Sequence, residues 1–182
     1  MIVLIEQGVH VLTIPFRTGN TWTYAVYSYD TINGIPTTST TVHFCHGGII
    51  MNNKEYFDVD GALIRLEDGV YYKYLNSRNG EAPIMIESPS VGDTWKNTTL
   101  VEASGLFPLI YTYTITATNQ HLTTPTGTFN EVVVLEVKSR GAQTATDEWH
   151  YYQDGVGLLK QQINYKHYPK RLLMELQSYS IQ

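Results

Sequence analysis

Apolar and polar residues alternate with a period of two along most of the chain. Over residues 21–29, for example, Trp22, Tyr24 and Val26 occupy every second position. This alternation is typical of β-strands that bury one face. Turn residues interrupt the pattern about every eight to twelve residues, which predicts about twelve short strands. No window shows the apolar spacing of an amphipathic helix, so we expect little or no helix.

Several segments refine this assignment. Asp60-Gly61 and Asp68-Gly69 each separate two alternating runs and predict tight hairpins. Residues 128–138 include four consecutive apolar residues, 132–135, which indicates a central strand covered on both faces. Residues 9–14 are predicted to form an early strand. Residues 172–178 fit a strand better than a terminal helix, because their leucine and methionine side chains alternate.

Composition agrees with the strand pattern. Of the 182 residues, 16% are charged, while Thr, Val, Ile and Tyr number 22, 14, 14 and 14. These residue types favour pleated, half-buried surfaces. No linker or block of charge divides the chain. We therefore predict one all-β domain over residues 1–182, a strongly twisted antiparallel sheet that curls into an open or half-closed barrel.

A short motif occurs twice. Gly-Asn-Thr-Trp at 19–22 is echoed by Gly-Asp-Thr-Trp at 92–95, and each precedes a predicted strand. An Asp-Gly-Val beside paired tyrosines also recurs, at 68–70 and 154–156. Glycine before an Asx residue favours a tight turn, and each Trp is expected to plug one end of the sheet. We interpret the chain as two related halves, about 15–88 and 89–182.

Charge and terminal features limit the possible partners. The formal net charge is −5 and no dense basic stretch is present, so we expect no nucleic-acid partner. No apolar run reaches the length of a membrane span, about 18 residues. The first six residues are apolar but lack the basic region and cleavage site of an export signal. Either the protein is cytoplasmic or such a signal has been removed or replaced.

Tyrosines gather on several predicted strands and are the main candidates for a ligand site. Aromatic side chains on adjacent strands could line a concave face. The alternative is that they form cross-strand pairs that stabilise the sheet. The candidate ligand-binding residues are Trp22, Tyr24, Tyr72, Tyr74, Tyr111, Tyr113 and Tyr151.

Other chemical patterns are weak. His43, Cys45 and His46 lie on one predicted strand, but His46 takes the opposite face, and two ligands do not make a zinc site. The single cysteine, Cys45, excludes an intrachain disulfide. Asp147-Glu148 sits among aromatic residues, as carbohydrate-binding acids often do, although a solvated strand edge explains it better. We predict no metal and no cofactor, and catalytic residues remain unassigned.

One family resemblance extends over about residues 15–165. It rests on four segments, Pro-Phe-Arg-Thr-Gly-Asn-Thr-Trp-Thr-Tyr at 15–24, Gly-Asp-Thr-Trp at 92–95, Gly-Thr-Phe-Asn-Glu-Val at 127–132 and the run from Trp149 to Lys160. With these segments the chain resembles a group of bacterial secreted or lipid-anchored β-proteins, mostly of unassigned function. The resemblance implies a half-barrel sheet like that of envelope lipid carriers, and a periplasmic, outer-membrane-associated or secreted location. The lipobox cysteine of that group is absent, since Cys45 lies mid-chain.

Three functions follow as hypotheses. The first is a non-enzymatic cell-envelope protein that binds a lipid or another apolar or amphipathic molecule in the concave sheet. The second is a structural or protein-interaction module of the cell surface, which predicts a filled core and an exposed apolar patch. The third is a hydrolase, which predicts a cleft where titratable groups with shifted pKa values converge.

Overall fold

The computed structural model describes residues 11–30, 36–75, 80–102, 106–141, 145–167 and 170–182. Its strands, in chain order, are β1 (Thr21–Asp30), β2 (Thr37–Met51), β3 (Lys54–Val59), β4 (Ala62–Glu67), β5 (Val70–Leu75), β6 (Gly80–Ile86), β7 (Thr94–Glu102), β8 (Leu106–Thr124), β9 (Gly127–Arg140), β10 (Thr146–Gln153), β11 (Gly157–Tyr165) and β12 (Lys170–Ser180).

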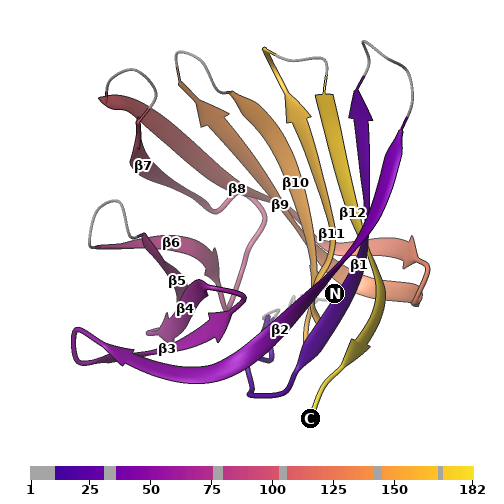
Figure 1. Cartoon of the computed structure of the whole chain (residues 1–182), viewed down its shortest axis with the longest axis horizontal. Helices are drawn as coiled ribbons and strands as arrows, with labels where there is room; N and C mark the ends of the chain where they lie inside the picture. Colours follow the sequence, from indigo (N-terminus) through magenta and orange to yellow (C-terminus); the bar gives the residue numbers. More distant parts are fainter. Residues whose placement is uncertain (1–10, 31–35, 76–79, 103–105, 142–144, 168–169) are drawn as a thin grey trace, which may run out of the picture.

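All twelve strands belong to one antiparallel sheet that curls almost into a barrel (Figure 1). The strand order is β6-β5-β4-β3-β2-β1-β12-β11-β10-β9-β8-β7. Each half is thus a simple meander, and β1 joins the halves by pairing with β12. The two end strands, β6 and β7, face each other across an open seam. Strands make up most of the described residues and no helix occurs among them, so the predicted all-β fold class is confirmed.

The predicted hairpin turns lie where the sequence placed them. Asp60-Gly61 connects β3 to β4, and Asp68-Gly69 connects β4 to β5. In both turns the two residues have positive φ, from 50° to 82°. Glycine tolerates this region freely and Asp tolerates it better than most residues. Because the turns hold only two residues, consecutive strands must pair directly with each other.

The two Gly-Asx-Thr-Trp motifs make the same backbone contacts. The Gly19 N–H donates to the Cys45 carbonyl at 3.0 Å, and the Cys45 N–H donates to the Asn20 carbonyl at 2.9 Å. The Gly92 N–H donates likewise to the Ile115 carbonyl, and the Ile115 N–H donates to the residue after Gly92, each at 2.9 Å. Both strands also shift register directly after these partners. The two motifs thus make equivalent contacts directly before β1 and β7.

The expectation for residues 9–14 is wrong where the structure describes them, while residues 9 and 10 lie outside the described part. From residue 11 to residue 16 the chain is irregular. Its Leu12 is 1% exposed and belongs to the first core cluster. The Leu12 N–H donates to the Glu87 carbonyl at 2.6 Å. The apolar alternation therefore reflects a segment that packs into the core without pairing as a strand.

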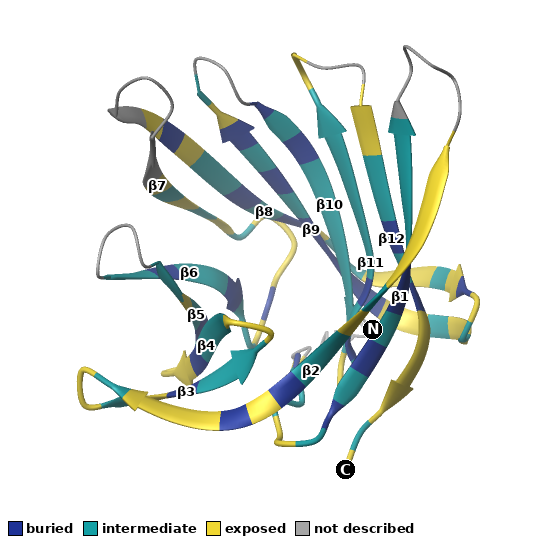
Figure 2. Cartoon of the chain, viewed as in Figure 1, coloured by how far each residue is buried: buried dark blue, intermediate teal, exposed yellow. Residues whose placement is uncertain are grey.

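Two hydrophobic clusters form the core. The first joins β5 and β6 to β8 and β9, and the second joins β1 and β2 to β9, β11 and β12. Figure 2 shows how buried and exposed residues alternate along these strands. All four residues from Val132 to Leu135 are buried, as predicted for a doubly covered strand. Part of this second cover comes from the long β8–β9 hairpin, which reaches β12: the Thr126 hydroxyl donates to the Leu176 carbonyl at 3.0 Å. Within the described residues, no helix meets the length and hydropathy needed to cross a membrane.

Candidate functional site

The main site candidate is a cavity of about 360 Å³ between the two halves, near the seam. Small-molecule sites typically measure about 300–1,000 Å³. The first half contributes a mostly apolar wall from β5 and β6, whereas the second half contributes a more polar wall from β7, β8, β9 and β10. The lining residues are Lys73, Leu75, Ala82, Ile84, Asn97, Tyr111, Tyr113, Val137, Glu148, His150 and Tyr152.

Glu148, His150 and Tyr152 form the polar centre of this cavity. They occupy every second position of β10, and therefore share one face of the strand. The His150 Nε2 lies 2.9 Å from a Glu148 carboxylate oxygen, and the Tyr152 hydroxyl lies 3.5 Å from His150 Nδ1. The Thr146 hydroxyl donates to the other Glu148 oxygen at 2.8 Å. Gln161 on β11 lies within 3.4 Å of Glu148 and 3.0 Å of His150.

The electrostatic environment keeps Glu148 ionised. Burial by itself would raise the pKa of Glu148, but hydrogen bonds from His150, Thr146 and Gln161 outweigh it, so the pKa is lowered. Burial and the nearby charge of Glu148 raise the pKa of Tyr111. The pKa of Tyr113 is raised to about 12, mainly by burial and further by Tyr111 and by the charge of Glu148. Glu148 thus places one negative charge in the cavity, beside neutral tyrosines and across from the exposed Lys73.

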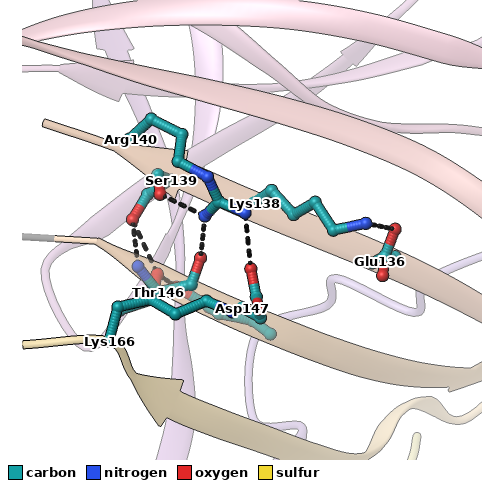
Figure 3. A network of polar contacts seen from close by, with 8 residues as sticks. Glu136, Lys138, Ser139, Arg140, Thr146, Asp147 and Lys166 are labelled. Carbon is teal, nitrogen blue, oxygen red and sulfur yellow. Dashed lines mark hydrogen bonds and ion pairs between the residues drawn. The ribbon is translucent and has the colours of Figure 1, made fainter.

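The opposite face of the same strands carries a separate ion-pair network (Figure 3). Arg140 donates to Asp147 at 2.9 Å and to the carbonyls of Ser139 and Thr146. Lys166 also pairs with Asp147. Asp147-Glu148 is therefore no solvated edge, because β10 lies between β9 and β11 and the two carboxylates face opposite sides of the sheet.

A second, apolar cavity of about 150 Å³ adjoins the first and shares Ile84 and Tyr152 with it. The Trp22 indole N–H donates to the Val156 carbonyl at 2.7 Å, and the Tyr24 hydroxyl donates to the Leu158 carbonyl at 3.0 Å. These bonds satisfy the polar atoms of both rings, so apolar ring surface is left to face the cavity. Its lining residues are Ile14, Phe16, Trp22, Tyr24, His43, Val59, Ile64, Ile84, Tyr152, Gly157 and Leu158.

Trp95 bridges the seam beside the larger cavity. It lies on β7 and stacks on Tyr113, with ring centroids 5.3 Å apart and planes 1° apart. Its indole N–H donates to the Pro83 carbonyl of β6 at 3.1 Å. Trp22 and Trp95, which follow the two equivalent turns, therefore lie beside one cavity each.

Four of the seven predicted ligand residues line a cavity, and three do not. Trp22 and Tyr24 line the smaller cavity, and Tyr111 and Tyr113 line the larger one. The other three lie elsewhere. Tyr72 stacks under Arg65 and Tyr74 packs against Tyr56, while Tyr151 joins the second hydrophobic cluster. These three alternate with cavity residues of the same strands, which places them on the opposite face.

The sequence did not single out Glu148, His150 and Tyr152 as one group of site residues. Their spacing of two was available as a signal, because it places all three on one face of a strand. The neighbouring set Asp147, Trp149 and Tyr151 has the same spacing, however, and a similar mixture of acid and aromatic side chains. Alternation alone does not tell which face is concave.

The remaining candidates fall outside this site or contribute singly. His43 lines the smaller cavity, where burial lowers its pKa. Cys45 is fully buried, and burial raises the pKa of its thiol. His46 lies 3.4 Å from Asp60. Across the part of the chain that the structure describes, no three His, Cys, Asp or Glu side chains are grouped to hold a metal ion.

Comparison with known proteins identifies a fold. No protein-family model and no curated protein matches the chain. The chain is similar in structure to a Bacteroides fragilis protein named a "putative exported protein with YmcC-like fold", with a TM-score of 0.55 and 11% identity over 93% of this chain and 99% of that one. A "putative lipoprotein" from Parabacteroides distasonis aligns with a TM-score of 0.43 and 12% identity over the same shares. The first likeness shows a shared fold.

Proposed function

We propose that this protein is a non-enzymatic binding protein of the bacterial cell envelope that holds an amphipathic molecule inside its curved sheet. The observation that carries the proposal is the pair of adjoining cavities, one polar and one apolar, that meet at Ile84 and Tyr152. One ligand with a polar end and a hydrocarbon end fits both walls at once. Ligand sites of this kind are mostly apolar with a few placed polar groups.

The cavities also weigh against a purely structural module. Such a module predicts a filled interior and a continuous apolar patch on the outside. Here two cavities remain between the packed core residues of the two halves. The larger exposed apolar side chains are distributed over many elements, among them Val42 on β2, Leu66 on β4 and Ile110 on β8.

The cell-envelope setting rests on two likenesses. The motif resemblance described above is to secreted or lipid-anchored bacterial proteins. The structural likeness is to a protein whose name includes the word exported. Both favour a location outside the cytoplasm, where a carrier shields hydrocarbon from water. A ligand of this class explains why a sheet with 16% charged residues keeps an apolar interior accessible.

Native mass spectrometry of lightly purified protein tests the proposal. We expect an adduct that persists through gentle ionisation and that organic extraction releases as an amphiphile. A blocking variant, Ile84→Trp, fills the point where the two cavities meet. It should remove the adduct while the circular dichroism spectrum stays unchanged. If wild-type protein carries no adduct and binds none of a series of ten-carbon amphiphiles in calorimetry, the proposal is wrong.

A hydrolase is the second candidate, and one observation favours it. Glu148, His150 and three tyrosines converge in one cavity, several with shifted pKa values. A His held by a carboxylate can act as a general base toward water. The larger cavity's lining includes no Ser, Thr or Cys, so a covalent intermediate on such a side chain is not favoured. Turnover of a panel of ester and glycoside substrates that Glu148→Gln abolishes would establish this candidate over the carrier.

A further inference from the structure

We propose that the polar end of the bound amphiphile is a cationic nitrogen, an ammonium group held by the Glu148 carboxylate among tyrosine rings. This inference rests on the proposed binding function and specifies its ligand class. It follows from three features of the larger cavity: the charge balance of its carboxylate, the rings around that carboxylate, and the position of the neighbouring lysine.

Glu148 differs from the other well-covered carboxylates in its ion-pair partner. Its side chain is 14% exposed, and its ion-pair contact is with His150, which is charged only when protonated. Among the ion pairs of the described residues, four other carboxylates are 20% exposed or less, and each contacts a Lys or Arg. They are Glu81, Glu136, Asp147 and Glu175. Glu148 alone in this set faces a cavity and has no permanent cation beside it.

The other polar contacts of Glu148 come from neutral donors, the Thr146 hydroxyl and the Gln161 amide. Together with the His150 hydrogen bond, these donors keep the carboxylate ionised, and they add no positive charge of their own. A charge in a partly buried site attracts an opposite charge more strongly than it would in water. The cavity therefore favours a positively charged group over a neutral or negative one.

Aromatic rings complete the environment of this carboxylate. Tyr111, Tyr113 and Tyr152 line the same cavity, and the charge of Glu148 contributes to raising the pKa of each. The faces of aromatic rings attract ammonium groups, and proteins bind quaternary ammonium ligands in aromatic cages. This fold already uses such a contact elsewhere, since the Arg65 guanidinium lies 4.8 Å from the Tyr72 ring centre.

The remaining charged group of the lining is Lys73 on the opposite wall. It is exposed, on β5, whereas Glu148 lies on β10 in the second half. Because the Lys73 ammonium reaches solvent, its field at the interior is screened. The hydrocarbon end of the ligand then extends past Tyr152 into the smaller cavity, which contains no Lys, Arg, Asp or Glu in its lining.

Isothermal titration of the full chain with three ten-carbon probes tests the inference: decyltrimethylammonium, decyl sulfate and 1-decanol, each below its aggregation concentration. We expect the ammonium probe to bind at least tenfold more tightly than either of the others. Equal binding of all three, or tighter binding of the sulfate, overturns the cationic head group and leaves the carrier function standing. Binding of none overturns the carrier function itself.

Two variants locate the effect. Glu148→Gln keeps the shape of the side chain and should reduce ammonium affinity about tenfold while leaving 1-decanol affinity unchanged. Glu136→Gln is the matched control, since it removes the same charge from the opposite face of the neighbouring strand, and it should change neither affinity. Equal losses in both variants would show a general charge effect and contradict the site. The ranking of the probes on wild-type protein needs no variant to fold.

Discussion

The two halves of the sheet begin in the same way and end differently. Each enters its first strand through a Gly-Asx-Thr-Trp turn that pairs with a fully buried residue, Cys45 in one half and Ile115 in the other. After that point β3, β4 and β5 have six residues each, whereas β9, β10 and β11 have 14, 8 and 9. The short strands give an apolar wall, and the long strands give the polar wall and the back of the barrel.

This difference indicates how two meanders that begin with the same turn can build two unlike walls. A sheet of long strands can bury both faces, as β9 does, because the extended β8–β9 hairpin reaches back to β12. Short strands have few core residues and need another source of stability. In the first half that source is a compact ion-pair network on the outer face, in which Arg65 contacts Glu81 and Glu67, and Glu81 also contacts Lys54 and Tyr56.

Removing Arg65 should cause the largest loss in the free energy of unfolding, because it disrupts the ion-pair network of the short-stranded half. The Arg65 side chain is 6% exposed, and Arg65→Met leaves the Glu81 carboxylate without its main partner. Breaking a buried pair costs about 3–5 kcal/mol in the free energy of unfolding. The control, Arg140→Met in the second half, removes an ion pair whose arginine is 50% exposed, and should cost about 1 kcal/mol or less. Urea denaturation measures both, and equal losses would contradict the contrast.

The same network should make the protein sensitive to acid. Hydrogen bonds from Arg65 above all lower the pKa of Glu81 to about 2 from its usual 4.5. A lowered pKa means that the stabilisation is complete above about pH 4.5 and is lost as the pH falls toward about 2. We expect wild-type stability to drop as the pH falls from about 4.5 to about 2, and Glu81→Gln to start lower and to drop less over that range. Parallel pH profiles for the two proteins would refute this assignment.

The buried residues that pair with the two turns offer a matched comparison. Ile115 and Cys45 are both 0% exposed. Ile115→Ala removes three carbon atoms and should lower the free energy of unfolding by about 2–5 kcal/mol. Cys45→Ala removes one sulfur atom and should cost about 1 kcal/mol. Chemical denaturation of both variants measures the two losses in the free energy of unfolding. If Cys45→Ala lowers stability as much as Ile115→Ala, the two sites are not equivalent.

The two turn glycines should give modest effects that are similar to each other. Gly19 has φ +92° and Gly92 has φ +97°, where an alanine is strained. Each Gly→Ala change should cost about 1–2 kcal/mol. Gly19→Ala should cost slightly more, because a Cβ there would lie 3.1 Å from the side chain of Gln182, whereas nothing lies within 4 Å at Gly92. Thermal melts of the pair test this, and a neutral Gly92→Ala would break the equivalence.

Strand positions were predictable because alternation and turn dipeptides are local signals. Asp60-Gly61 and Asp68-Gly69 fixed two hairpins without any knowledge of the rest. The site was less accessible, since alternation identifies the two faces of a strand but not which one is concave. Tyr111 and Tyr113 lie on the inner face and Tyr151 on the outer one, although all three belong to similar aromatic runs. The pairing of β1 with β12, which determines the inside, is a long-range contact.

In the proposed complex, a hydrocarbon chain occupies the space beside Trp22. Tryptophan fluorescence with a bromine-tipped probe, 11-bromoundecyltrimethylammonium, measures this directly, because bromine quenches at contact range. Trp149 alternates with the cavity residues of β10 and serves as the internal reference. Trp95→Phe protein keeps Trp22 and Trp149, and the probe should quench part of its emission. Trp95→Phe/Trp149→Phe protein keeps Trp22 alone, and the probe should quench nearly all of its emission. If the probe binds and the Trp22 fluorescence is not quenched, the hydrocarbon chain does not lie beside Trp22.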